Sequence, residues 1–235
     1  MQPKIILLDF DGVVSPNSIG LQRDWVVRRL AATGQIGEGI LDDLVRSVST
    51  SVPARVSLEL LSLIYGIKWS DEDLAALERE VTAGTVIDGA FNDLLATCRA
   101  KGISLKIVST ASSRLLRAMP RLDERMLCPP PGDSKADPKT FRRLAATLDT
   151  AANETLLVDD TPMVLRAAKL AGFQTALMNG PLYDEQDYAD HRIYVDMRCD
   201  SLSDILRLVR HPSAETKHTR TGTRAGGRPR LISSS

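Results

Sequence analysis

Acidic and hydroxyl side chains follow the ends of three apolar segments in this chain. The first segment, IILL, runs into Asp9 and Asp11, which are one residue apart, and then into a glycine. A second apolar segment ends at Ser109 and Thr110, and a third ends in two adjacent aspartates. Unpaired carboxylates are costly to bury, so these acids require water, a cation or a reaction beside them.

This set of side chains favours phosphate chemistry with a divalent cation. The adjacent aspartates are Asp159 and Asp160, and Lys135 lies just before a predicted helix start. Several carboxylates at one point repel one another, and oxygen ligands without a nearby His or Cys favour Mg²⁺ over Zn²⁺. The lysine, the hydroxyls and the helix N-termini favour an anion. A cation and an anion together indicate phosphoryl chemistry.

For these side chains to meet, the apolar segments must be strands of one sheet. Their continuous apolar runs are typical of parallel strands that are covered on both faces. Helical stretches separate them, with start signals at Asp137-Pro138 and Thr161-Pro162 and a stop at Gly172. The order predicts an α/β fold in which ligands bind at the carboxyl ends of the strands. The predicted strands are residues 4–9, 104–109, 154–159, 174–178 and 192–195.

About 75 residues without a convincing strand interrupt this alternation after the first strand. Their periodicity predicts helices, which we interpret as a cap domain, residues 15–86, over the carboxyl edge of a core made of residues 1–14 and 87–211. The predicted helices span about 17–33, 38–48, 54–65 and 71–83. The candidates for contact with a substrate are Arg23, Arg28, Arg46, Arg55 and, outside the cap, Arg114.

The last segment, residues 212–235, has a composition unlike the rest of the chain. It holds five Lys/Arg and one acid, whereas the whole chain has a formal net charge of 0. We expect a disordered basic tail that is solvated rather than bound to nucleic acid. Three scattered cysteines, no signal-peptide pattern and no apolar run long enough to span a bilayer predict a cytoplasmic protein without a membrane partner.

Four fragments of the chain resemble one known family. The fragments are LLDFDGVV, LKIVST, SKADPKTF and LLVDDTPMVLRAAKLAG, in that order over residues 4–210. They resemble the phosphatase-type hydrolases of the haloacid dehalogenase (HAD) superfamily that carry a helical cap, such as phosphoglycolate phosphatases and β-phosphoglucomutases. The resemblance implies a Rossmann-like parallel-sheet core with an inserted α-helical cap domain.

The resemblance also implies a role for each candidate residue. Asp9 would be the nucleophile that becomes an aspartyl-phosphate, and Asp11 would be the general acid and then the base. Gly12 would permit the tight backbone after the nucleophile. The phosphoryl oxygens would be held by Ser109, or Thr110 in its place, and by Lys135. The Mg²⁺ ligands would be Asp9, Asp11 through its backbone carbonyl, and Asp160, with Asp159 in support.

One departure from the family's pattern concerns the metal. Many relatives carry another acid four residues after the acidic pair, where this chain has Val164. Either aspartate of the pair is then a candidate for direct contact with Mg²⁺, and we favour Asp160.

The resemblance predicts a Mg²⁺-dependent phosphatase. The substrate would be a small phosphorylated metabolite, sugar- or cyclitol-phosphate-like. Asp11 favours a phosphate monoester because an alkoxide leaving group needs the proton that this residue would give. A phosphosugar mutase and a catalytically inactive binding or regulatory module of the same family are the alternatives. Neither nucleic acid nor a protein partner is expected.

Overall fold

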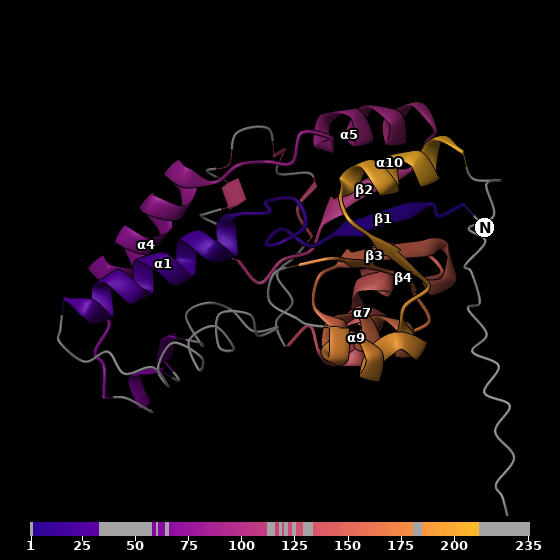
Figure 1. Ribbon diagram of the computed structural model, residues 1–235. Helices are drawn as coiled ribbons and strands as arrows, with labels where there is room; N and C mark the ends of the chain where they lie inside the picture. Colours follow the sequence, from indigo (N-terminus) through magenta and orange to yellow (C-terminus); the bar gives the residue numbers. More distant parts are fainter. Residues whose placement is uncertain are drawn as a thin grey trace, which may run out of the picture.

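The structure, a computed structural model, describes residues 2–32, 58–59, 61–63, 66–111, 116–117, 119, 122–123, 126–128, 134–180 and 185–211. The predicted helix at 38–48, most of the one at 54–65, and the tail at 212–235 lie outside the described residues, as do Arg46, Arg55 and Arg114. The described part of the chain forms a sheet with helices on both faces and a pair of helices that projects from it (Figure 1).

The sheet has five parallel strands in the order β2-β1-β3-β4-β5. β1 lies between β2 and β3, and Ile5 is paired with Ser104 on one side and with Thr155 on the other. The carboxyl ends of these three strands are therefore adjacent. The strands are β1 (Ile5–Leu8), β2 (Ser104–Ile107), β3 (Thr155–Asp159), β4 (Gln174–Met178) and β5 (Met197–Cys199).

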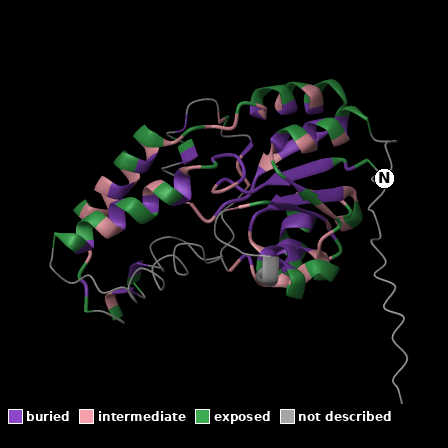
Figure 2. Cartoon of the chain, in the orientation of Figure 1, coloured by how far each residue is buried: buried purple, intermediate pink, exposed green. Residues whose placement is uncertain are grey.

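Alternate residues of the central strands β1, β3 and β4 enter two separate hydrophobic clusters. Ile6 and Leu8 belong to the cluster that includes α5 (Phe91–Ala100) and α10 (Leu202–Arg210). Ile5 and Leu7 belong to the cluster that includes α7 (Pro138–Thr147) and α8 (Pro162–Leu170). Figure 2 shows the strands buried between these helices, as expected for a parallel sheet. The predicted parallel α/β fold is confirmed.

The helices α1 (Ser18–Ala31) and α4 (Asp71–Gly84) lie between β1 and α5 in the chain and pack against each other beyond the edge of the sheet (Figure 1). Apolar side chains on one face of each helix are buried, among them Trp25, Val26, Leu77 and Val81. This confirms a helical insertion after the first strand. That it is a cap domain with the bounds 15–86 stays a proposal.

The predicted helix starts have different outcomes. Asp137 caps α7 by accepting the Lys139 N–H at 2.8 Å, and Pro138 is the first helical residue. Thr161 precedes α8, but its side chain makes no cap hydrogen bond. Its hydroxyl donates to the Asp160 carboxylate at 3.2 Å instead. Gly172 follows the end of α8 with a φ of 95°, which favours glycine.

The prediction of a strand at 192–195 is wrong. The helix α9 (Glu185–His191) continues into the 3-10 turn η3 (Arg192–Tyr194), and Ile193 is 78% exposed. The strand that pairs with β4 is β5, whose sequence, MRC, has no apolar run. A second 3-10 turn, η2 (Ala152–Glu154), precedes β3. Among the described residues, every helix is too short or too polar to cross a membrane.

Candidate active site

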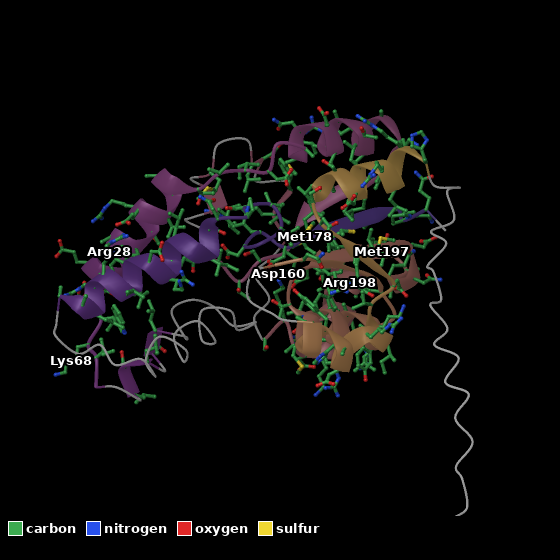
Figure 3. All side chains as sticks on the ribbon, viewed as in Figure 1. Arg28, Lys68, Asp160, Met178, Met197 and Arg198 are labelled. Carbon is green, nitrogen blue, oxygen red and sulfur yellow. The ribbon has the colours of Figure 1, made fainter. Side chains whose placement is uncertain are left out.

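The candidate site lies at the carboxyl edge of the sheet, where β1 and β3 end side by side. Asp9 follows β1 directly, and its backbone N–H donates to the Val158 carbonyl at 2.9 Å. Asp159 is the last residue of β3, and Asp160 follows it. Figure 3 shows Asp160 at the edge of the sheet that faces the projecting helices, whereas Lys68 lies at their far end.

Three of the predicted metal-binding aspartates form one cluster. Each of Asp9, Asp159 and Asp160 offers a carboxylate oxygen that lies within 4.8 Å of the other two. Their exposed fractions are 7%, 0% and 1%. Three ionised carboxylates that are this close together and buried from solvent repel one another strongly unless cations balance their charge.

Lys135 supplies one positive charge to this cluster. Its Nζ lies 2.8 Å from Asp9 Oδ1 and 2.7 Å from Asp159 Oδ2, and the residue is only 3% exposed. The turn that carries Lys135 is fixed by the Ser134 carbonyl, which accepts from the Asp137 N–H and the Thr140 hydroxyl. One lysine balances one carboxylate, so three ionised aspartates would leave a net negative charge.

The pKa values reflect this imbalance. Burial raises the pKa of Asp9 to about 7; Lys135 opposes the rise, and the carboxylates of Asp159 and Asp11 add to it. Burial, followed by the charges of Asp159 and Asp9, raises the pKa of Asp160 well above its ordinary value. Burial alone would lower the pKa of Lys135, but the two adjacent carboxylates raise it. Without a further cation, burial and the mutual repulsion of the carboxylates favour the protonated forms of Asp9 and Asp160.

Asp160 has the features of a direct metal ligand. Its Oδ2 is buried and has no hydrogen-bond donor among the residues that the structure describes. The backbone of two glycines lies close to this oxygen. A Cβ placed on Gly12 would lie 2.1 Å from Asp160 Oδ2, and one placed on Gly180 would lie 3.0 Å from it. The oxygen-only donor set and this bare oxygen fit a hard divalent cation.

Asp159 is occupied by protein contacts instead. Its Oδ1 accepts the Thr161 N–H at 2.9 Å, and its Oδ2 is paired with Lys135. Oδ2 of Asp159 therefore has a cationic partner, whereas Oδ2 of Asp160 has no hydrogen-bond partner among the described residues.

The Asp11 side chain is not part of the three-carboxylate cluster. Its Oδ1 accepts a hydrogen bond from Gln22 Nε2 at 3.1 Å, and Gln22 lies on α1. Burial raises the pKa of Asp11, while hydrogen bonds from Ser18 and Gln22 and the charge of Lys135 oppose the rise. The sequence reasoning missed Gln22, because no local pattern indicates which face of α1 meets the core.

Ser109 and Thr110 follow β2 at the same edge of the sheet. The Val108 N–H just before them donates to the Leu8 carbonyl at 2.9 Å, so Ser109 lies beside the end of β1. Ser109 is buried, and its Oγ accepts the Ala111 N–H at 2.9 Å, while Thr110 is half-buried. An accepting hydroxyl still carries a hydrogen to donate, which is compatible with a phosphate contact.

Comparison of the sequence with known proteins finds one partial relative. No protein-family model matches the chain. The enolase-phosphatase E1 of Streptomyces avermitilis is 28% identical over 145 residues, which cover 56% of this chain and 57% of that protein. The chain thus spans little more than half of that curated relative.

Solved structures match a larger part of the chain. CbbY of Rhodobacter sphaeroides in complex with phosphate has a TM-score of 0.67 at 19% identity, covering 87% of this chain and 96% of CbbY. A CbbY mutant in complex with xylulose-(1,5)-bisphosphate has the same TM-score, 0.67, at 18% identity, covering 86% and 96%. A predicted phosphoglycolate phosphatase of Haemophilus somnus has a TM-score of 0.64 at 16% identity, covering 88% and 98%. With the acidic edge of the parallel sheet and the inserted helices, these likenesses identify the fold of this chain as that of the HAD superfamily, as predicted.

Proposed function

We propose that this protein is a Mg²⁺-dependent phosphatase, a phosphoric monoester hydrolase that acts on a small phosphorylated metabolite. The observation that carries this proposal is the buried cluster of Asp9, Asp159 and Asp160, which a single lysine leaves short of positive charge. A divalent cation would neutralise the remaining negative charge of the three aspartates, and an anion such as a phosphate group could then bind beside the cation. The similarity to an enolase-phosphatase and to CbbY supports the same chemistry.

The proposed metal ligands are the side chains of Asp9 and Asp160 and the backbone carbonyl of Asp11. Asp159 supports them through its contacts with Lys135 and Thr161. When bound, Mg²⁺ would neutralise the carboxylates and withdraw charge from the phosphoryl group.

In the proposed reaction, an Asp9 carboxylate oxygen forms a bond to phosphorus as the bond to the ester oxygen breaks. The electron pair of that bond goes to the ester oxygen, which takes a proton from the Asp11 carboxyl. In the second step, water attacks the phosphorus of the aspartyl-phosphate, Asp11 takes a proton from the water, and Asp9 is released. Lys135 holds Asp9 in place through an ion pair with Asp9 Oδ1. The hydroxyl of Ser109, or that of Thr110, donates a hydrogen bond to the phosphoryl oxygens.

The helical insertion is the proposed cap, residues 15–86, and it would favour small substrates by closing over the edge of the sheet. CbbY is seen with a phosphorylated sugar, which supports sugar- or cyclitol-phosphates as the first class to test. Of the arginines that the sequence indicated, Arg23 and Arg28 are exposed on α1, and each lies beside an acidic side chain, Asp24 and Glu80 respectively.

The decisive experiment is phosphate release by the purified chain from an aryl phosphate and a panel of phosphosugars, with Mg²⁺ and with EDTA. We expect turnover that requires Mg²⁺ and falls at least about 10³-fold in Asp9→Asn, which removes the nucleophile. Asp93→Asn, an exposed aspartate on α5, is the matched control and should retain full activity.

Other results would support the alternatives. Interconversion of phosphosugar isomers that needs a bisphosphate primer would indicate a mutase. Absence of turnover on the whole panel, together with Mg²⁺ binding, would indicate a binding module and overturn the proposal.

The proposed compartment is the cytoplasm. All three cysteines are free thiols, and burial raises the pKa of the Cys98 thiol to about 11, so it resists oxidation. Free, unreactive thiols are typical of a reducing compartment.

A further inference from the structure

The side chain of Asp11 is hydrogen-bonded to residues of the inserted helix α1. Gln22 lies in the second turn of α1, is 9% exposed, and its Nε2 lies 3.1 Å from Asp11 Oδ1. We propose that Gln22 is a positioning residue that orients the Asp11 carboxyl for proton transfer, so that the insertion completes the acid–base group of the core. This inference rests on the proposed phosphatase function.

The chemistry of the contact explains how one amide can orient a carboxyl. The Gln22 NH₂ group only donates, so it stabilises Asp11 Oδ1 as an acceptor. By holding Oδ1, the hydrogen bond fixes the orientation of the Asp11 carboxyl, and Ser18 on the same helix also contacts this side chain. The inserted helix thereby sets the direction in which Asp11 faces a substrate.

The location of Gln22 ties this orientation to the placement of α1. Asp11 belongs to a tight turn in which the Gly12 N–H donates to the Ser15 carbonyl at 2.8 Å, and α1 begins three residues later at Ser18. Ser18 also contacts Asp11 and donates to the Ser15 carbonyl at 3.2 Å. α1 is anchored by the buried side chains of Trp25 and Leu30, so a displacement of the helix would move Gln22 relative to Asp11.

The test is the dependence of kcat/KM on the leaving group in Gln22→Met, which keeps the length of the side chain and removes the donor. kcat/KM reports the transfer of the phosphoryl group to Asp9. Proton donation matters most for a poor leaving group, so we expect a loss of about 10- to 100-fold with an alkyl phosphate. With 4-nitrophenyl phosphate, whose leaving group needs little protonation, we expect a loss of less than about 3-fold.

Two further variants make the test specific. Gln22→Asn keeps the amide group on a side chain that is shorter by one methylene, so the amide lies farther from Asp11. This variant should fold and should show the same dependence of kcat/KM on the leaving group as Gln22→Met. Asp24→Ala, an exposed position on the same helix, should leave both substrates unaffected. Thermal unfolding of each variant with Mg²⁺ checks that the site is assembled.

The outcomes separate this inference from the proposed function. The inference alone would be overturned if the wild type is active and both Gln22 variants lose activity to the same extent with the two leaving groups. It would also be overturned if neither variant loses activity with either leaving group. A wild type that hydrolyses no phosphate ester would remove the proposed function and the inference with it.

Discussion

At the scale of single residues, the backbone at Gly12 lies so close to Asp160 that a side chain on residue 12 would overlap with the Asp160 carboxylate. Gly12 has a φ of 80°, and a Cβ there would lie 2.1 Å from Asp160 Oδ2. Gly12→Ala would therefore both strain the turn after β1 and displace the carboxylate that we propose as a metal ligand. We expect a loss of at least about 10-fold in Mg²⁺ affinity, measured by the Mg²⁺-dependent shift in the unfolding temperature.

Gly20→Ala is the matched control for this substitution. Gly20 lies within α1, and nothing is within 4 Å of a Cβ placed on it. Alanine there should stabilise the fold by about 0.5–1 kcal/mol and leave Mg²⁺ binding unchanged. Normal Mg²⁺ binding by Gly12→Ala would contradict the assignment of Asp160 as a ligand.

The sequence predicted residues at the sheet edge better than residues on the insertion. Asp9, Asp159 and Asp160 follow apolar strands directly, so parallel pairing alone brings them together. Lys135 was also predicted, through its position before a well-signalled helix start, and its ion pairs tie it to the cluster. Gln22 was missed because its contact with Asp11 depends on the placement of a whole helix, which no local pattern encodes.

At the scale of elements, the start of α4 combines a capping box with a contact to α1. Ser70 accepts the Asp73 N–H at 3.1 Å, and the Asp73 carboxylate accepts the Ser70 N–H at 2.9 Å and pairs with Arg29 at 2.7 Å. The Arg29 and Ser70 hydrogen bonds lower the pKa of Asp73 to about 2. The contribution of Asp73 to stability is therefore present above its ordinary pKa and is lost as the pH falls toward 2.

Asp73→Ala should cost about 1 kcal/mol, the typical value of a cap, because the Arg29 pair is largely solvated and adds little. The measurement is denaturant unfolding at pH 7. Asp71→Ala removes an acid from the same first turn but leaves the capping box, so it should cost less than about 0.5 kcal/mol. Equal losses in the two variants would show that the box does not stabilise α4.

The elements themselves were predictable where a pattern is local. Strong capping and apolar runs identified four of the strands and the helices between them. β5 was misplaced because the run at 192–195 is apolar, whereas the residues that pair with β4 are held by backbone hydrogen bonds at a sheet edge. The helix α10 was not predicted either, although Ser201 and Asp204 form a capping box at its start, a signal that the sequence contains.

At the scale of the whole molecule, Asn17 joins the two connections between the sheet and the inserted helices. Its Oδ1 accepts from the Ser15 hydroxyl and the Val86 N–H, and its Nδ2 donates to the Gly84 carbonyl at 2.9 Å. One side chain thus fixes the outgoing chain to the returning chain. Such a contact would limit how far the insertion can turn relative to the sheet.

Asn17→Ala should loosen this junction without unfolding the core. The Val86 amide loses its acceptor, so we expect its hydrogen exchange to accelerate at least about 10-fold, while the amides of β1 remain protected. Asn92→Ala, an exposed asparagine on α5, should change neither. Unchanged exchange at Val86 would show that other contacts hold the two connections together.

The raised pKa values of the site aspartates make the stability of the whole fold depend on pH. Between the ordinary pKa of an aspartate, 3.8, and the value of about 7 for Asp9, the metal-free folded protein holds a proton that the unfolded chain has released. The contribution of Asp9 to stability therefore falls as the pH rises through this window, and the raised pKa of Asp160 acts in the same direction.

A divalent cation stabilises the ionised carboxylates, so Mg²⁺ should oppose this fall. We expect the Mg²⁺-induced rise in the unfolding temperature to be small at pH 5 and to reach several degrees at pH 8, because about 1 kcal/mol corresponds to about 2–4 °C in a chain of this size. Thermal scans from pH 5 to pH 8, with Mg²⁺ and with EDTA, measure it. In Asp160→Asn the growth with pH should disappear, since the variant removes a carboxylate that the metal would hold. A Mg²⁺ effect of equal size at every pH would mean that the ion binds away from the buried aspartates, and the metal site proposed here would then be wrong.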